Sequence, residues 1–164
     1  FTAQKLHQYP PDFGLGCLVR SRVDLVVEEL GLRLLRAIGF TGIAEVEFKR
    51  DARDGVYRLI ELNPRPWDQH ALGAACGVDV AYLAYRDHCE PPAPRAASDG
   101  HERYWVGEAG LWGATKEAIR TADLGFLARL PGLLVRPRVC ALWSLDDPRP
   151  AWRALTARHD PPGR

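Results

Sequence analysis

Apolar residues alternate with polar ones in some segments of the chain and recur every three or four positions in others. Alternation predicts strands at residues 2–9 and 15–20, separated by a turn that contains proline and glycine. Residues 22–38 instead carry one apolar stripe, which predicts a helix capped by Ser21 with Asp24 in its first turn. The stripe consists of Val23, Val26, Leu30, Leu34 and Ile38.

The segment "GIAEVEFKRDARDGVYRLIELNP", residues 42–64, alternates in two runs around a polar turn with a glycine, which predicts a β-hairpin. Its register follows from matching the apolar faces, because a slip by one residue would bury carboxylates at several kcal/mol per ion. The predicted register places Glu47 opposite Glu61. It also pairs Phe48 with Ile60 and Val46 with Leu62, and it leaves Glu45, Glu47, Lys49, Leu59, Glu61 and Asn63 on the other face.

The rest of the chain predicts shorter elements. They are a short helix and turn at 70–78, a helix from Asp79 to about Cys89, a strand at 103–107, a helix at 114–129, a strand at 139–144 and a terminal helix within 146–159. Residues 91–102 are rich in Pro, Ala and Ser and indicate a linker. We therefore expect an α+β fold, an antiparallel sheet flanked by helices, divided into residues 1–90, the linker 91–102 and a C-terminal extension at 103–164.

Composition excludes some classes of function. The net charge of +1 lacks the basic excess of a nucleic-acid binder. No apolar run approaches the ~20 residues that span a bilayer, and no signal peptide opens the chain. The four cysteines have neither metal-site nor disulfide spacing, which favours reduced thiols in the cytoplasm. The chain starts at Phe1 and has no methionine, so we expect a processed protein or a fragment.

The polar face of the predicted hairpin carries the candidate chemistry. Two carboxylates directly opposite each other repel, and either a shared proton or a bound cation relieves the repulsion. Glu47, Glu61 and the amide oxygen of Asn63 are hard oxygen ligands of the type that Mg²⁺ takes, usually together with substrate phosphates. The pattern thus suggests a metal and triphosphate site. The same residues also suit a solvated hairpin face with no ligand.

Two basic residues extend this candidate site. Arg65 follows Asn63 between two prolines, and its planar guanidinium suits a carboxylate or a phosphate. Lys5, on the first predicted strand, would supply a further positive charge to the phosphates, although a lysine near a chain end is also commonly solvated.

The stretch "GIAEVEFKRDARDGVYRLIELNPRPW" resembles the acidic hairpin of the ATP-grasp superfamily, most closely its carboxylate–amine ligase branch with D-aspartate ligase-like proteins. The segments "KLHQYPPDFGLG" and "LGAACGVDVAYLAYRDHC" are similar to the same branch, and "DDPRPAW" is similar to its C-terminal segment. The resemblance implies the C-terminal subdomain of an ATP-grasp domain, with ATP and Mg²⁺ as cofactors. It implies Glu47, Glu61 and Asn63 as metal and nucleotide ligands, Arg65 at the acyl phosphate, and Lys5 at the phosphates of ATP.

The family activates a carboxylate as an acyl phosphate, which an amine then attacks. The resemblance therefore implies an ATP-dependent ligase acting on a small carboxylate and an amine. Because the family clamps ATP between two subdomains, we expect this chain to lack the N-terminal ATP-grasp part and to be inactive alone. Alternatives are a degenerate module that serves as scaffold or ligand binder, a carboxylase-like ATP-grasp member, and a hydrolase that uses Cys76 or Cys89.

Overall fold

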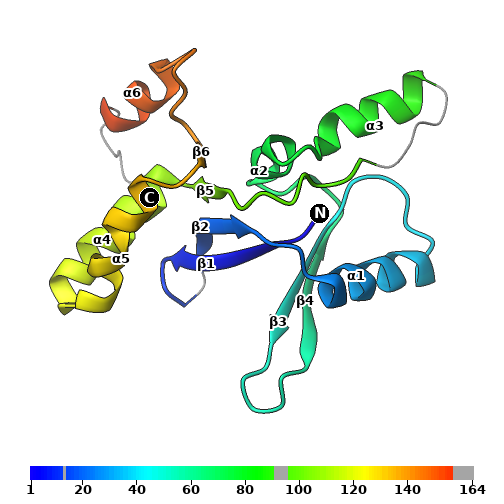
Figure 1. Cartoon of the computed structure of the whole chain (residues 1–164), viewed down its shortest axis with the longest axis horizontal. Coiled ribbons are helices and arrows are strands. Elements are labelled where there is room, and N and C mark those ends of the chain that lie inside the picture. The colour runs from blue at the N-terminus through cyan, green and yellow to red at the C-terminus, as the bar shows by residue number, and fades with distance from the viewer. Residues whose placement is uncertain (13, 91–95, 157–164) are drawn as a thin grey trace, which may run out of the picture.

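The computed structural model describes residues 1–12, 14–90 and 96–156 (Figure 1). The described residues form an α+β fold. The strands are β1 (Ala3–Tyr9), β2 (Leu15–Ser21), β3 (Glu45–Arg50), β4 (Tyr57–Asn63), β5 (Tyr104–Val106) and β6 (Arg138–Cys140). The helices are α1 (Leu25–Ala37), α2 (His70–Ala75), α3 (Val80–Cys89), α4 (Glu108–Thr121), α5 (Leu124–Leu134) and α6 (Arg149–Thr156). Within the described ranges, no helix combines the length and the apolar character needed to cross a membrane.

Four strands form the central sheet in the order β1-β2-β5-β6, which is antiparallel except for the parallel pair β5–β6. Val19 and Trp105 face α2 on one side of the sheet and pack against Leu72 and Cys76, both fully buried. The other side packs against α4 and α5 through a second buried cluster. That cluster contains Leu18, Tyr104 and Val106 with Leu111 and Leu133. The sheet is thus sandwiched between helices, as alternating strand side chains with two apolar faces require.

Helix α4 packs directly against β1 and β2, and glycines line its contact face. A Cβ added to Gly110 would lie 2.7 Å from the Cβ of Cys17, and one added to Gly113 would lie 2.4 Å from the ring of Tyr9. Such distances leave no space for any side chain. A larger residue at either position would push α4 away from β1 and β2.

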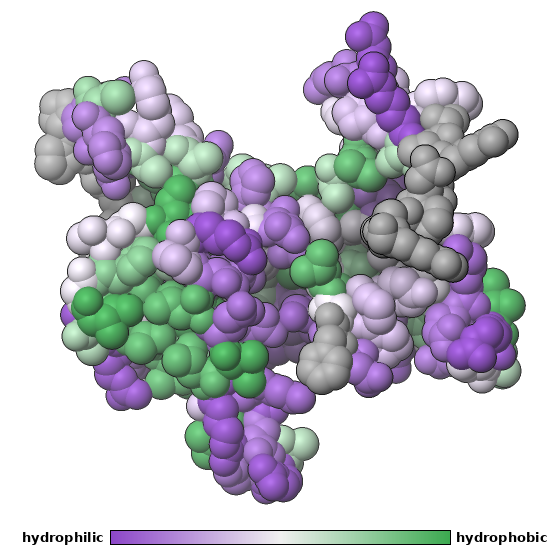
Figure 2. Space-filling model, turned by 180° about the vertical axis from the view of Figure 1, so that it is seen from behind, coloured by the Kyte–Doolittle hydropathy of each residue, from purple (hydrophilic) through white to green (hydrophobic). Residues whose placement is uncertain are grey.

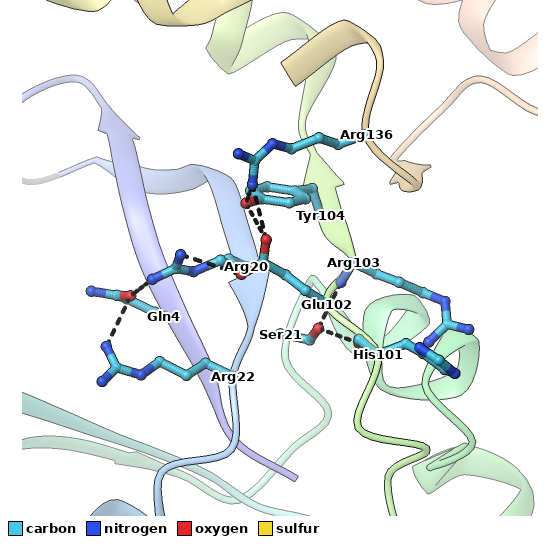
Figure 3. A network of polar contacts seen from close by, with 9 residues as sticks. All are labelled: Gln4, Arg20, Ser21, Arg22, His101, Glu102, Arg103, Tyr104 and Arg136. Atoms are coloured by element: carbon cyan, nitrogen blue, oxygen red, sulfur yellow. Dashed lines mark hydrogen bonds and ion pairs between the residues drawn. The ribbon is translucent and has the colours of Figure 1, made fainter. Parts of the chain in front are cut away.

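A polar network runs across the same sheet near the start of β5 (Figure 3). Arg20 donates to Gln4 Oε1 at 2.6 Å and to Glu102 Oε2 at 3.3 Å. Arg136 donates to Glu102 Oε1 at 2.9 Å and lies 5.2 Å above the ring of Tyr104. The hydrogen bond from the Tyr104 hydroxyl, supported by the two arginines, lowers the pKa of the Glu102 carboxyl. The network therefore links β1, β2, β5 and the segment after α5.

The second sheet is the two-stranded hairpin β3–β4, and α1 packs beside it; we call residues 24–63 the arm. Asp24 caps α1 by accepting a hydrogen bond from the Val27 amide at 3.2 Å. The Tyr57 hydroxyl on β4 donates to the same carboxylate at 2.9 Å. An added Cβ at Gly31 would lie 3.9 Å from the Phe48 ring, so α1 rests against the apolar side of the hairpin.

No residue of the arm is fully buried. Figure 2 shows apolar surface gathered on the side of the molecule where α1 lies, next to the polar tip of the hairpin. Exposed apolar side chains of α1 include Leu25 and Val26, which are 72% and 57% exposed. The arm therefore contributes little to the apolar core and depends on a few specific contacts.

Several predicted elements are confirmed: the first two strands, the short helix α2, the Asp79 cap of α3 and the strand that became β5. The predicted cap of the first helix is wrong. Asp24 takes that position, whereas the Ser21 hydroxyl donates to the His101 carbonyl and accepts from the Arg103 amide. The Ser21 hydroxyl is thus bound by residues 80 and 82 positions away and does not cap α1.

The helix predicted at 114–129 is two helices. Ala122 adopts a left-handed conformation with φ 54°, and Asp123 then caps α5 through the Phe126 amide at 2.9 Å. The strand predicted at 139–144 ends at Cys140, just before residues that contact the distant Glu108. The amides of residues 141–143 donate to the Glu108 carboxylate at 2.8–3.2 Å, and the Ala141 amide also donates to the Val106 carbonyl of β5 at 2.9 Å.

The terminal helix is confirmed from Arg149, with Pro150 in its first turn; residues 157–159 of the prediction lie outside the described residues, as do 91–95 of the linker. Strands β5 and β6 belong to the predicted C-terminal extension and complete the sheet begun by β1 and β2. The division of the chain at 91–102 stays a prediction.

Candidate functional site

The hairpin register places four polar residues on one face. Glu47 lies directly opposite Glu61, as the apolar pattern predicted, and Glu45 lies opposite Asn63. Residues two apart on a strand share a face, so the three carboxylates and the amide all lie on the same side of β3–β4. Backbone pairing alone thus places one acid opposite another acid and one acid opposite an amide.

The predicted register is wrong between Glu61 and the hairpin turn. Phe48 pairs with Leu59 instead of Ile60, because the register shifts between Glu47 and Phe48 and leaves Ile60 as the extra residue of a β-bulge. The bulge moves Leu59 into line with the apolar residue Phe48. With strict alternation, Leu59 would lie on the same face as Glu61. The bulge instead pairs Leu59 with Phe48, while Glu61 stays opposite Glu47.

Lys5 reaches this face from the central sheet. Its ammonium lies 2.9 Å from Glu47 Oε1, although the two residues are 42 positions apart. Both side chains are about one third exposed, so the contact is accessible to a ligand. The structure thus brings together Lys5 of β1 and Glu47 of β3.

Asn63 and Arg65 both meet Glu45. The Asn63 amide nitrogen donates to Glu45 Oε2 at 3.2 Å, and an Arg65 guanidinium nitrogen lies 3.9 Å from the same oxygen. Arg65 also donates to the carbonyl of Pro66 at 3.0 Å, which turns its side chain back along its own loop. The arginine remains 55% exposed and could still reach a ligand on the acidic face.

Glu61 differs from the other two acids. Its side chain is exposed and forms no hydrogen bond or ion pair with any described residue. A carboxylate of this kind, beside the Glu47 carboxylate and an amide, is available for a cation.

The donor set fits Mg²⁺ by its chemistry. Every candidate ligand is an oxygen, two are carboxylates, and open positions would remain for waters and phosphate oxygens. No cluster of three or more histidine, cysteine, aspartate or glutamate side chains suited to a metal was found in the described residues. The proposed set instead has two glutamates and an asparagine.

Glu45 is the site residue that sequence reasoning did not single out. The pattern had already placed it on the polar face with Glu47. The missing signal was its pairing partner, since only the register puts it across from Asn63.

The hairpin is attached to α1 by the contact between Tyr57 and Asp24. Burial alone would raise the pKa of Asp24, but hydrogen bonds from the Val27 amide and the Tyr57 hydroxyl outweigh it and lower that pKa. The same hydrogen bond to Asp24 raises the pKa of Tyr57. The carboxylate thus stays ionised at neutral pH and holds the far end of β4 to the start of α1.

Part of this α+β unit, including the hairpin with its acidic face, is similar to an ATP-binding domain. Residues 18–87 match the family model described as carbamoyl-phosphate synthase L chain, ATP binding domain. The match includes α1, the hairpin and Arg65, and it starts after Lys5. Searches of curated proteins and of solved structures found no match.

Proposed function

We propose that this chain is the C-terminal portion of an ATP-dependent ligase that activates a carboxylate as an acyl phosphate for attack by an amine. The observation that supports it most is the convergence of Lys5, Glu47, Glu61 and Asn63 from β1 and both hairpin strands. An ATP-grasp domain implies ATP-dependent ligase-type activity in general. The choice of carboxylate and amine as substrates rests on the resemblance of the hairpin segment.

In the proposed reaction, a substrate carboxylate oxygen attacks the γ-phosphorus of ATP, and the bond to the β–γ bridging oxygen breaks to release ADP. The amine nitrogen then attacks the acyl carbon, inorganic phosphate leaves, and the amine loses a proton. Mg²⁺ held by Glu47, Glu61 and Asn63 would neutralise phosphate charge and align the reacting groups. Lys5 would bind phosphate oxygens, and Arg65 would bind the acyl phosphate through its planar donors.

The position of Lys5 gives this assignment a physical basis. Its ammonium already lies within hydrogen-bonding distance of Glu47, so a phosphate held by a metal at Glu47 would also be in reach of Lys5. The closed site must exclude water, because an acyl phosphate hydrolyses. We therefore propose that a second, N-terminal ATP-grasp part provides the opposite wall, and that the 164-residue chain alone binds Mg-ATP weakly and has no turnover.

The test is ADP formation by the protein encoded by the complete reading frame, assayed with panels of carboxylates and amines. Glu61→Ala and Asn63→Ala should each lower kcat/KM more than about 100-fold, since each removes a ligand of the ion that stabilises the transferring phosphoryl group. Glu29→Ala, an exposed acid of α1, is the matched control and should leave the rate unchanged.

Retained turnover in both site variants would contradict the assignment. Binding of Mg-ATP without ADP formation for any substrate pair would favour the non-catalytic alternative. ADP formation that depends on bicarbonate instead of an organic acid would favour the carboxylase-like alternative. Calorimetry with Mg-ATP on the 164-residue chain tests the second part of the proposal, and micromolar affinity would contradict it.

A further inference from the structure

Glu45 has no role in the function proposed above, yet it is the least exposed acid on the hairpin face. Its side chain is 23% exposed, against 36% for Glu47, and Glu61 is more exposed than either. Its Oε2 atom is the shared neighbour of the Asn63 amide nitrogen and the Arg65 guanidinium. Glu45 is thus engaged with two of the residues that the proposed reaction uses.

The contact with Asn63 decides which end of the amide faces a ligand. A side-chain amide has a nitrogen that only donates and an oxygen that only accepts, and only the oxygen can bind a cation. Because Glu45 accepts from the nitrogen, the oxygen is the atom left for a ligand; it accepts no hydrogen bond within the described part of the chain. Without that acceptor, the two ends of the amide would be free to exchange.

The contact with Glu45 also orients the side chain of Arg65. Two prolines limit the backbone around Arg65, but its long side chain is 55% exposed and has many rotamers. The Glu45 carboxylate 3.9 Å away is its charged partner among the described residues, and it biases the guanidinium toward the acidic face. One carboxylate therefore influences the orientation of both an amide and a guanidinium.

We propose that Glu45 is a positioning residue, which presents the Asn63 amide oxygen to the divalent cation and holds Arg65 next to it. This inference rests on the proposed function, since it concerns the same site. Partners of metal ligands commonly act in this way, and their removal typically costs about 10–100-fold in metal affinity. The competing role for Glu45 is that of a third direct ligand, and the two roles predict different results for a neutral isostere.

The test measures Mn²⁺ binding by electron paramagnetic resonance, with Mg²⁺ competition, on the complete protein in the presence of ATP. Glu45→Ala should weaken binding about 10-fold or more. Glu45→Gln keeps an oxygen that accepts from the Asn63 amide, so its affinity should stay within about 3-fold of the unaltered protein if positioning is the role. Circular dichroism melts establish that each variant is folded, and Glu29→Ala is again the control.

A double-mutant cycle isolates the coupling between the two residues. If Glu45 acts through the amide, Asn63→Ala should weaken Mn²⁺ binding and Glu45→Ala should add little to that loss in the double variant. Asn63→Asp places two carboxylates opposite each other, and the pair Glu45→Gln with Asn63→Asp restores a hydrogen bond of reversed polarity. The pair should therefore melt at a higher temperature than Asn63→Asp alone.

Three results would overturn the inference. If Glu45→Gln and Glu45→Ala lose the same Mn²⁺ affinity, the negative charge of Glu45 is what binding needs, and Glu45 is a direct ligand. Unchanged Mn²⁺ affinity in Glu45→Ala, in a protein where Asn63→Ala is impaired, would remove any role. If the losses of Mn²⁺ affinity in the cycle are fully additive, Glu45 does not act through Asn63. Absence of Mn²⁺ binding in the unaltered protein would instead contradict the proposed function, and with it this inference.

Discussion

The central sheet and the arm are stabilised in different ways. The sheet is covered on both sides by helices and contains fully buried residues such as Leu72 and Cys76. The arm, residues 24–63, has no fully buried residue and is held together by the hydrogen bond between Tyr57 and Asp24. It contacts the N-terminal segment through the Lys5–Glu47 ion pair and through the Asp24 amide, which donates to the Thr2 hydroxyl. The arm nevertheless carries most of the candidate chemistry. The region that contains the buried core and the region that presents the candidate ligands are therefore largely separate.

The largest expected effect tests the sheet against the arm. Leu72→Ala removes a side chain with no exposed surface and should destabilise the protein by about 2–5 kcal/mol. Leu59→Ala in β4, where the side chain is 48% exposed, should cost less than about 1 kcal/mol. Urea denaturation followed by tryptophan fluorescence measures both. Equal costs would show that the arm is as firmly packed as the sheet.

A smaller effect concerns the attachment of α1 to the hairpin. Asp24→Ala removes a helix cap and the acceptor for Tyr57 and should cost about 1–2 kcal/mol. Tyr57→Phe removes only the hydrogen bond and should cost about 1 kcal/mol. Hydrogen exchange of the α1 amides is the measurement. Protection lost across β1 and β2 as well would contradict the separation of the two regions.

The pH dependence of this attachment has a definite sign. The pKa of Asp24 is lowered in the folded state, so its stabilising contribution is present above the ordinary value of 3.8 and is lost as the pH falls through the folded value. Asp24→Asn should therefore differ from the unaltered protein in stability at pH 7 and approach it in strong acid. A constant difference across that range would mean that the carboxylate charge is not involved.

The smallest effect concerns His7 in β1, whose ring lies 4.4 Å from that of Phe126. Burial lowers the pKa of His7, and the nearby Asp123 offsets part of this. The contribution of neutral His7 is thus present above the ordinary value of 6.5 and is lost as the pH falls below it. Urea midpoints at pH 8 and pH 5.5 should differ less in His7→Gln than in the unaltered protein. An equal pH response in both proteins would show that groups other than His7 cause the pH dependence of stability.

Sequence patterns predicted much of this fold and part of the site, and the failures have physical causes. Pairing of Glu47 with Glu61 follows from apolar matching, because only that alignment keeps the acids out of the core. The bulge at Ile60 could not be read, since alternation alone does not show an extra residue in one strand. Ser21 was misassigned because its partners, His101 and Arg103, are distant in sequence.

The break between α4 and α5 and the role of Glu45 were missed for a related reason. Ala122 adopts the left-handed conformation that glycine usually signals, so no residue type marked the break. Glu45 carries the same alternation as Glu47, and only its partner across the strands distinguishes it. Local patterns thus predicted element types, whereas contacts between distant residues decided boundaries and roles.

The place of β5 between β2 and β6 has a practical consequence for anyone who shortens this polypeptide. A version that stops at residue 90 would keep the whole hairpin, yet it would strip the backbone groups of Leu18 and Val19 of their partners. A bare, apolar strand edge recruits other chains. Such a version should precipitate on expression, and adding back the segment through Cys140 should recover material that stays in solution.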